Sequence, residues 1–160
     1  WWTPGVRRLP QGQGDLGQRM ARALRAAGPG PVLLVGSDIP DLECGHLADA
    51  FRRLAGRDYV FGPAADGGFW LVGTGPGRAY RRMFQGVRWS TPDTLAETLG
   101  RLRGRRIAMA ATLGDVDDGA GWKRWKIERR LRRRAAANVP EGAASARRNC
   151  TAEADCRVAT

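Results

Sequence analysis

Acidic residues occupy several positions from which they could bind a metal ion or accept a proton. Asp38 follows the apolar run Val32–Val35 across a Gly-Ser turn, Asp66 precedes two glycines, and the cluster Asp115-Val-Asp-Asp118 follows a late strand candidate. Carboxylates are hard oxygen ligands that suit Mg²⁺ or Mn²⁺, and they can also take a proton from a hydroxyl. Spacing alone leaves open whether Asp38 only caps the next helix and whether Asp66 only makes a turn.

The run Val32–Val35 has no alternation of polar and apolar residues, which predicts a strand buried on both faces, as in a parallel sheet. Ligands of open α/β sheets bind beyond the carboxyl ends of the strands, so we expect Asp38 at the functional edge. If the strand candidate Arg105–Ala110 lies beside this strand, the acids from Asp115 to Asp118 share that edge. These features predict an α/β fold with parallel strands.

The spacing of the other apolar residues predicts the elements that position these acids. Short apolar runs predict two more strands, at Tyr59–Gly62 and Phe69–Val72. Helical spacing predicts a helix that opens at Leu16, a second over Glu43–Leu54, a third with Thr91 as N-cap, and an amphipathic fourth from Trp122 to Leu131.

A glycine-rich loop, Gln11–Gly17, precedes the first predicted helix. Free N–H groups at a helix N-terminus behind glycines suit a phosphate, but Asp15 adds a negative charge there. The pattern alone favours the simpler interpretation, in which Asp15 is the N-cap and the glycines form a turn.

The 160 residues are 42% hydrophobic and carry a net charge of +11, which suits one domain with a basic end. Residues 1–121 hold 16 Lys and Arg against 12 Asp and Glu, and residues 122–160 hold 11 against 4. A basic end can bind nucleic acid, but it is more often a solvated helix or a disordered segment, so nucleic acid is not an expected partner. We predict a domain over residues 1–127 and a basic, disordered tail over 128–160.

No run of 18 or more apolar residues is present, so we expect no membrane span, and the first residues do not resemble a signal peptide. Three cysteines, Cys44, Cys150 and Cys156, stand beside a single histidine, His46, without the spacing of a zinc site or a disulfide framework. Free thiols predict a cytoplasmic protein. His46 lies off the buried stripe of its helix, so we expect it at a boundary of the fold.

Five motifs in a fixed order extend this interpretation: Gln11-Gly-x-Gly-Asp-Leu-Gly-x-Arg-Met20, Gly36-Ser-Asp-Ile-Pro-Asp-Leu42, Gly62-Pro-Ala-x-Asp-Gly-Gly68, Trp89-Ser-Thr91 and Asp115-Val-Asp117. With these motifs in this order, the chain resembles the glycosyltransferase-like family of the GT-A superfamily, in particular its radical-SAM-associated or arsenosugar-biosynthesis type. The resemblance covers about residues 8–126. The chain is more distantly similar to guanylyltransferases that activate phospholactate or the molybdenum cofactor.

The resemblance implies a nucleotide-diphospho-sugar transferase fold, which is an α/β fold with a mostly parallel sheet flanked by helices. It also implies a nucleotide-sugar donor, a small-molecule acceptor and Mg²⁺ or Mn²⁺ as cofactor. It implies metal binding by Asp38 and Asp117, and an acceptor-directed role for Asp66, which would position or deprotonate the acceptor hydroxyl. It also implies a set of substrate-binding residues, which are Gly14, Asp15, Leu16, Gly17, Gly67, Gly68, Ser90 and Thr91.

The expected function is a metal-dependent glycosyltransferase. One alternative is a nucleotidyltransferase of the guanylyltransferase kind acting on a small phosphorylated substrate, and another is an inactive fragment with a nonspecifically binding basic tail. Family members begin with a strand and a basic loop that this sequence does not contain, so the resemblance predicts an N-terminally truncated domain with an incomplete sheet. The segment Asp118-Gly-Ala-Gly-Trp122 also differs from the usual family ending.

Overall fold

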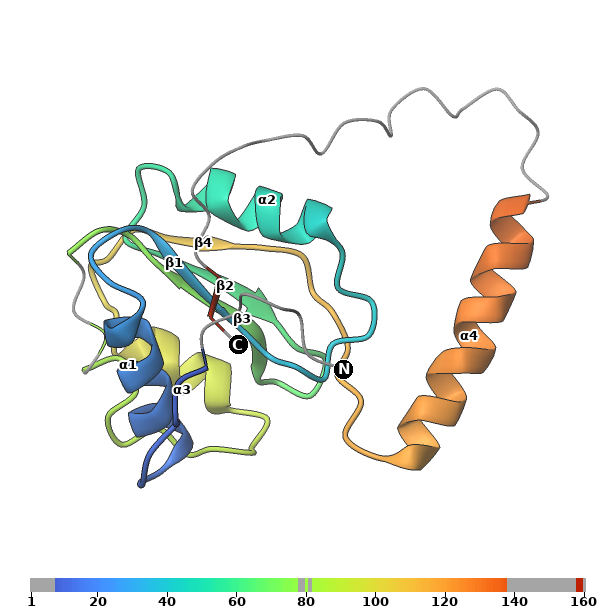
Figure 1. Ribbon diagram of the computed structural model, residues 1–160, viewed down its shortest axis with the longest axis horizontal. Coiled ribbons are helices and arrows are strands. Elements are labelled where there is room, and N and C mark those ends of the chain that lie inside the picture. Colours follow the sequence, from blue (N-terminus) through green and yellow to red (C-terminus); the bar gives the residue numbers. More distant parts are fainter. Residues whose placement is uncertain (1–7, 78–79, 81, 138–157, 160) are drawn as a thin grey trace.

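The computed structural model describes residues 8–77, 80, 82–137 and 158–159. Within them the chain forms one sheet with helices on both faces (Figure 1). The elements in chain order are α1 (Leu16–Ala26), β1 (Val32–Val35), α2 (Cys44–Leu54), β2 (Tyr59–Pro63), β3 (Phe69–Thr74), α3 (Thr94–Gly100), β4 (Ile107–Met109), α4 (Gly119–Ala137) and β5 (Val158–Ala159).

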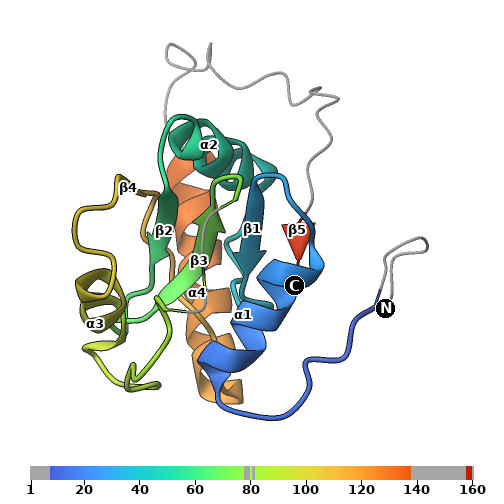
Figure 2. The ribbon, with the colours of Figure 1, turned by 90° about the vertical axis from the view of Figure 1, so that its left-hand side faces the viewer.

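The strands lie in the order β4-β2-β3-β1-β5 (Figure 2). Strand β3 is antiparallel to both β1 and β2, while β4 is parallel to β2 and β5 is parallel to β1. The sheet is therefore mixed, and the prediction of a mostly parallel sheet was wrong. Only the short loop 64–68 joins β2 to β3, and a parallel pair needs a crossover of a dozen or more residues.

Burial of β1 on both faces comes from the helices on either side of the sheet. Val32 and Leu34 pack in one cluster with Leu24 of α1, and Leu33 and Val35 pack in the other cluster with the α2 side chains. All four residues of β1 are buried. A continuous apolar run thus predicted two-sided burial correctly, although helices cover antiparallel strands here as well as parallel ones.

Strand β4 does not lie next to β1, because β2 and β3 stand between them. The segment between β4 and α4, residues 110–118, crosses the end of the sheet instead, and we call it the crossing segment. The amide of Leu113 donates to the carbonyl of Pro63 at 3.1 Å, and the amide of Val116 donates to the carbonyl of Asp38 at 3.0 Å. The expected meeting of the two acidic segments occurs through this crossing, not through neighbouring strands.

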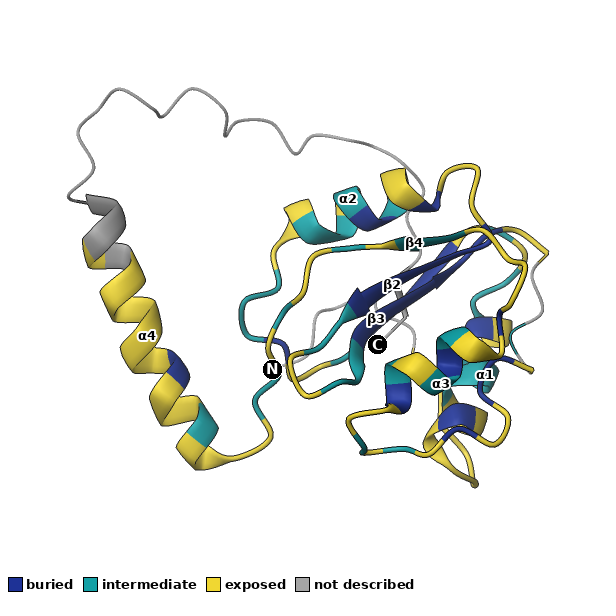
Figure 3. Ribbon diagram, turned by 180° about the vertical axis from the view of Figure 1, so that it is seen from behind, coloured by how far each residue is buried: buried dark blue, intermediate teal, exposed yellow. Residues whose placement is uncertain are grey.

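Helix α4 crosses the predicted domain boundary at residue 127 without a break and ends at Ala137. Most of its surface is exposed (Figure 3). Of the predicted tail, residues 128–137 belong to α4 and residues 158–159 form β5. The other tail residues lie outside the described part of the chain, so the expectation of disorder stays a prediction. No helix in the described ranges is both long and apolar enough to cross a membrane.

The N-cap of α3 also differs from the prediction. Asp93, not Thr91, precedes the first helical residue, Thr94. The amide of Thr94 donates to the carbonyl of Thr91 at 3.1 Å, so Thr91 belongs to a turn that leads into the helix.

Candidate functional site

A cavity of about 450 Å³ lies at the sheet end where β1 terminates, and we call it the acidic cavity. Its lining includes four carboxylates, those of Asp38, Asp66, Asp115 and Asp117. Among the described residues no lysine, arginine or histidine lines it. The remaining wall is formed by Leu16, Met20, Gly36, Ile39, Ala64, Gly68, Phe69, Trp70, Trp89, Ser90, Thr91, Pro92 and Thr94.

The end of β1 fixes the position of Asp38. The amide of Gly36 donates to the carbonyl of Trp70 at 2.8 Å, which is the last contact of β1 with β3, and the chain then turns. A Cβ atom at Gly36 would lie 2.8 Å from the Asp38 carboxylate, so glycine allows this carboxylate to stand close to the backbone. The bond between Val116 and the Asp38 carbonyl then fastens the crossing segment beside it.

Asp115 and Asp117 reach the cavity from the crossing segment. The indole N–H of Trp70 donates to the carbonyl of Ala111 at 2.9 Å and anchors the start of that segment. Alternate residues of an extended segment point to the same side, which explains why Asp115 and Asp117, but not Val116, line the acidic cavity. The two-residue spacing from Asp117 is the feature of the sequence that could have identified Asp115 as a site residue, although no separate role was predicted for it.

The surroundings of Asp115 in this cavity change the pKa of its carboxyl. Burial raises the pKa of Asp115 above its ordinary value, and a hydrogen bond to its own backbone opposes that rise. Three neighbouring negative charges raise this pKa further, those of Asp66, Asp117 and Asp38. Like charges that raise a pKa in this way mark a place where a cation would be stabilised.

Asp66 forms the turn between β2 and β3 and also lines the acidic cavity. Its Oδ1 accepts the amide of Gly68 at 2.8 Å. Gly67 has a φ of +90°, and a Cβ atom there would lie 2.1 Å from the carbonyl oxygen of Pro92. The amide of Leu95 donates to the Gly67 carbonyl at 3.0 Å, so this turn is packed tightly against the chain that leads into α3.

The segment from Trp89 to Thr91 forms another part of the wall of the acidic cavity. Ser90 has a positive φ of 58°, and the amide of Thr91 donates to the hydroxyl of Thr94 at 3.2 Å. The Trp89 ring packs against Phe69, with 6.4 Å between the ring centroids. Its indole nitrogen is buried without a hydrogen-bond partner among the described residues.

The glycine-rich loop, Gln11–Gly17, leads into α1. Asp15 caps α1, because its Oδ1 accepts the amide of Gln18 at 2.7 Å, which confirms the N-cap prediction. The substrate-binding role of this loop stays a prediction. Gly17 is buried, and a Cβ atom there would lie 2.5 Å from the Trp89 ring. Of the expected nucleotide loop only Leu16 lines the acidic cavity, whereas Gly14, Asp15 and Gly17 do not.

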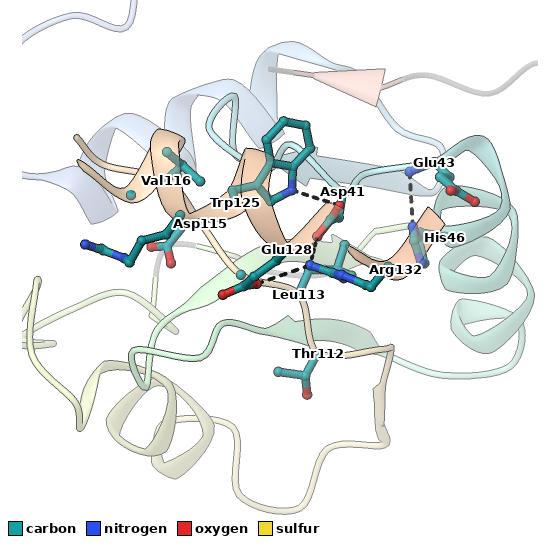
Figure 4. A pocket seen from close by; sticks show the side chains of 13 residues that line it. Asp41, Glu43, His46, Thr112, Leu113, Asp115, Val116, Trp125, Glu128 and Arg132 are labelled. Atoms are coloured by element: carbon teal, nitrogen blue, oxygen red, sulfur yellow. Dashed lines mark hydrogen bonds and ion pairs between the residues drawn. The ribbon is translucent and has the colours of Figure 1, made fainter. Parts of the chain in front are cut away.

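A second cavity, of about 570 Å³, lies between the start of α2, the crossing segment and α4, and we call it the α4 cavity (Figure 4). The indole N–H of Trp125 donates to Oδ1 of Asp41 at 2.9 Å. Arg132 lies 3.4 Å from Oδ2 of Asp41 and 3.4 Å from the Glu128 carboxylate. Asp115 lines both cavities, so the two adjoin at this residue.

The donor chemistry of the acidic cavity fits a divalent cation that a ligand helps to bind. No three His, Cys, Asp or Glu side chains in the described part of the chain are arranged as a metal site by themselves. Mg²⁺ is commonly held by one or two carboxylates together with water and substrate phosphates. Two of the four carboxylates therefore suffice for an ion that arrives with a phosphorylated ligand.

The chain is similar to known proteins in sequence and in fold. A family described as an uncharacterized protein conserved in bacteria (DUF2064) matches residues 1–91. A crystal structure from Desulfovibrio desulfuricans G20, provisionally named a nucleotide-diphospho-sugar transferase, is similar, with 35% identity and a TM-score of 0.63. That similarity covers 67% of this chain and 48% of the other, so this chain spans about half the length of the structure it matches. No curated protein matches the chain.

Proposed function

The chain belongs to the bacterial DUF2064 family, and we propose that it is a metal-dependent glycosyltransferase of the GT-A kind that uses a nucleotide-diphosphate sugar. The observation that carries this proposal is the set of four carboxylates that line one cavity without a cationic side chain in its described wall. Two unit charges 4 Å apart repel each other by about 1 kcal/mol in water and about 4 kcal/mol near a protein surface. A diphosphate can therefore enter this cavity only together with a cation.

Asp38 and Asp117 are the proposed ligands of Mg²⁺ or Mn²⁺. Both are exposed to the cavity, and the bond from Val116 to the Asp38 backbone ties their two segments together. A bound divalent ion would neutralise the donor diphosphate and stabilise it as a leaving group.

Asp66 is the proposed base. Its Oδ1 is occupied by the Gly68 amide, which leaves Oδ2 as the oxygen that would take the proton of the acceptor hydroxyl. The acceptor oxygen would form a bond to the anomeric carbon of the sugar, the bond from that carbon to the diphosphate oxygen would break, and the nucleoside diphosphate would leave. Ser90 and Thr91, which also line the acidic cavity, would orient the donor sugar. The apolar side chain of Leu16 would contact the nucleoside.

The experiment that tests this proposal is product analysis after incubation of the chain with nucleotide sugars and Mn²⁺. Glycosyl transfer releases a free nucleoside diphosphate, whereas nucleotidyl transfer releases pyrophosphate and would replace the proposal by its nearest alternative. We expect Asp66→Asn to reduce turnover while leaving donor binding in place, because only the proton acceptor is lost. Asp49→Asn, which alters a carboxylate paired with Arg52 and Arg53 on α2, is the matched control and should leave turnover unchanged.

A further inference from the structure

The α4 cavity adjoins the acidic cavity at Asp115 and is lined largely by polar side chains. We propose that this cavity binds the acceptor, and that the acceptor is an uncharged polyhydroxylated molecule, not a phosphate or a carboxylate. The assignment of the cavity to an acceptor rests on the proposed transferase function. The chemical class follows from the charges and hydrogen-bonding groups of the cavity itself.

The two cavities meet in a way that suits two reacting molecules. Asp115 contributes to both walls. His46, which lines the α4 cavity, lies edge-on to Trp70, which lines the acidic cavity, with 6.3 Å between the ring centroids. A donor in the acidic cavity and an acceptor in the α4 cavity would therefore approach each other across Asp115.

The charge of the α4 cavity opposes an anionic acceptor. Arg132 is shared between two acids, Asp41 and Glu128, so it offers little charge to a further anion. Among the described residues, four acids line the cavity against two arginines, the acids being Asp41, Glu43, Asp115 and Glu128 and the arginines Arg124 and Arg132. An acceptor that carries a phosphate would be repelled by this excess and by the neighbouring acidic cavity.

The polar groups of the α4 cavity suit hydroxyls. His46 accepts the amide of Glu43 on its Nδ1 at 3.1 Å. A neutral imidazole that accepts on Nδ1 carries its proton on Nε2, so His46 is fixed as a hydrogen-bond donor, while the carboxylates are acceptors. Hydroxyl groups both donate and accept hydrogen bonds and can satisfy both kinds of partner without adding charge.

Helix α4 forms one wall of this cavity and is fixed by the bond from Trp125 to Asp41. Asp41 stands three residues after the proposed metal ligand Asp38. The same loop therefore positions one wall of each cavity, and Trp125 and Arg132 act as positioning residues for the acceptor.

The single histidine of the chain provides a specific probe of this cavity, because its ring gives one set of NMR signals. We would titrate the full chain, at fixed pH and with Mg²⁺ and a nucleoside diphosphate present, with glucose and separately with glucose 6-phosphate. The two probes differ by one phosphate. We expect glucose to shift the His46 ring signals saturably, with an affinity roughly tenfold higher than that of glucose 6-phosphate.

A charge reversal tests the reason for that preference. Glu128→Lys, which reverses one charge in the wall of the α4 cavity, should shift the preference from glucose towards glucose 6-phosphate. Tighter binding of glucose 6-phosphate to the unaltered chain, or unchanged His46 signals with both sugars, would overturn the proposal. Binding of the nucleoside diphosphate, followed by calorimetry, is scored separately, so failure of the acceptor cavity can be told apart from failure of the donor site.

Discussion

Carboxylates line both the acidic cavity and the α4 cavity, but their surroundings differ. In the α4 cavity both oxygens of Asp41 have partners, the indole of Trp125 and the guanidinium of Arg132. In the acidic cavity four carboxylates face one space without a basic side chain among the described lining residues. Burial raises the pKa of Asp115, and the other three carboxylates of this cavity raise it further.

The comparison teaches that the partners of an acid decide its role more than its place in the sequence does. Asp38 and Asp41 lie on the same loop, three residues apart. Asp41 is bonded to α4 and holds that helix in place, whereas Asp38 faces the acidic cavity. An acid without a protein partner is the one that can bind a cation.

Exchanging Asp38 and Asp41 in turn for asparagine tests this comparison with the largest expected effect. Asp38→Asn should weaken Mn²⁺ binding in the presence of a nucleoside diphosphate by roughly 100-fold, because even outer partners of metal ligands contribute 10- to 100-fold. Electron paramagnetic resonance of free Mn²⁺ measures this binding. Asp41→Asn is the control, and an equal loss in both variants would contradict the distinction between them.

A backbone change should disturb the acidic cavity through the turn that holds Asp66. Gly67→Ala combines a positive φ with a Cβ atom that would clash with the Pro92 backbone, and we expect it to lower the free energy of unfolding by about 1–3 kcal/mol. Gly56→Ala has a similar φ, +69°, but open space around it, so it should lose less. Chemical denaturation compares the two, and equal losses would show that the contact with Pro92 does not constrain the turn.

Loss of one hydrogen bond should affect the α4 cavity alone. Trp125→Phe keeps an aromatic ring at a position that is 9% exposed but removes the donor to Asp41, at an expected cost of about 1 kcal/mol. Hydrogen exchange of the α4 amides should become faster, and Mn²⁺ binding should stay within about twofold of the unaltered chain. Unchanged exchange would mean that this bond does not hold the helix.

Replacement of Asp115, which lines both cavities, should produce the smallest effect, and the size of that effect depends on pH. Because the pKa of Asp115 in the folded chain lies above its ordinary value of 3.8, the charged carboxylate destabilises the fold. This cost is absent below the ordinary value and grows as the pH rises through the raised one. Asp115→Asn should therefore raise the melting temperature near neutral pH, and the gain should vanish below pH 3.8. A variant less stable than the unaltered chain at neutral pH would contradict this origin of the shift.

Local features of the sequence predicted most of the elements and several residues of the site. The run Val32–Val35 is β1, and the predicted helix over Glu43–Leu54 corresponds to α2. Asp38, Asp66 and Asp117 line one cavity, and the roles that the family resemblance implies for them stay predictions. These predictions depended on short-range patterns of apolar residues, glycines and acids, which the structure retains.

Features that depend on distant residues were not predicted. The mixed sheet follows from the antiparallel pairing of β2 and β3. The Asp-Gly-Gly turn between these strands was recognised in the sequence, but the antiparallel pairing was not predicted from it. The bond between Trp125 and Asp41 joins residues 84 positions apart, and no periodicity reveals such a pairing. Asp115 gained significance only when the crossing segment placed it between the two cavities.

The most direct test of the central claim, that the acidic cavity accepts a diphosphate only with a cation, is calorimetric titration of the full chain with UDP and, in parallel, with GDP. Each titration is carried out with Mg²⁺ and again with EDTA. We predict that at least one nucleotide binds in Mg²⁺ and that this binding disappears in EDTA. Binding of equal affinity in EDTA would contradict the account, because four unneutralised carboxylates would then have accepted a diphosphate unaided.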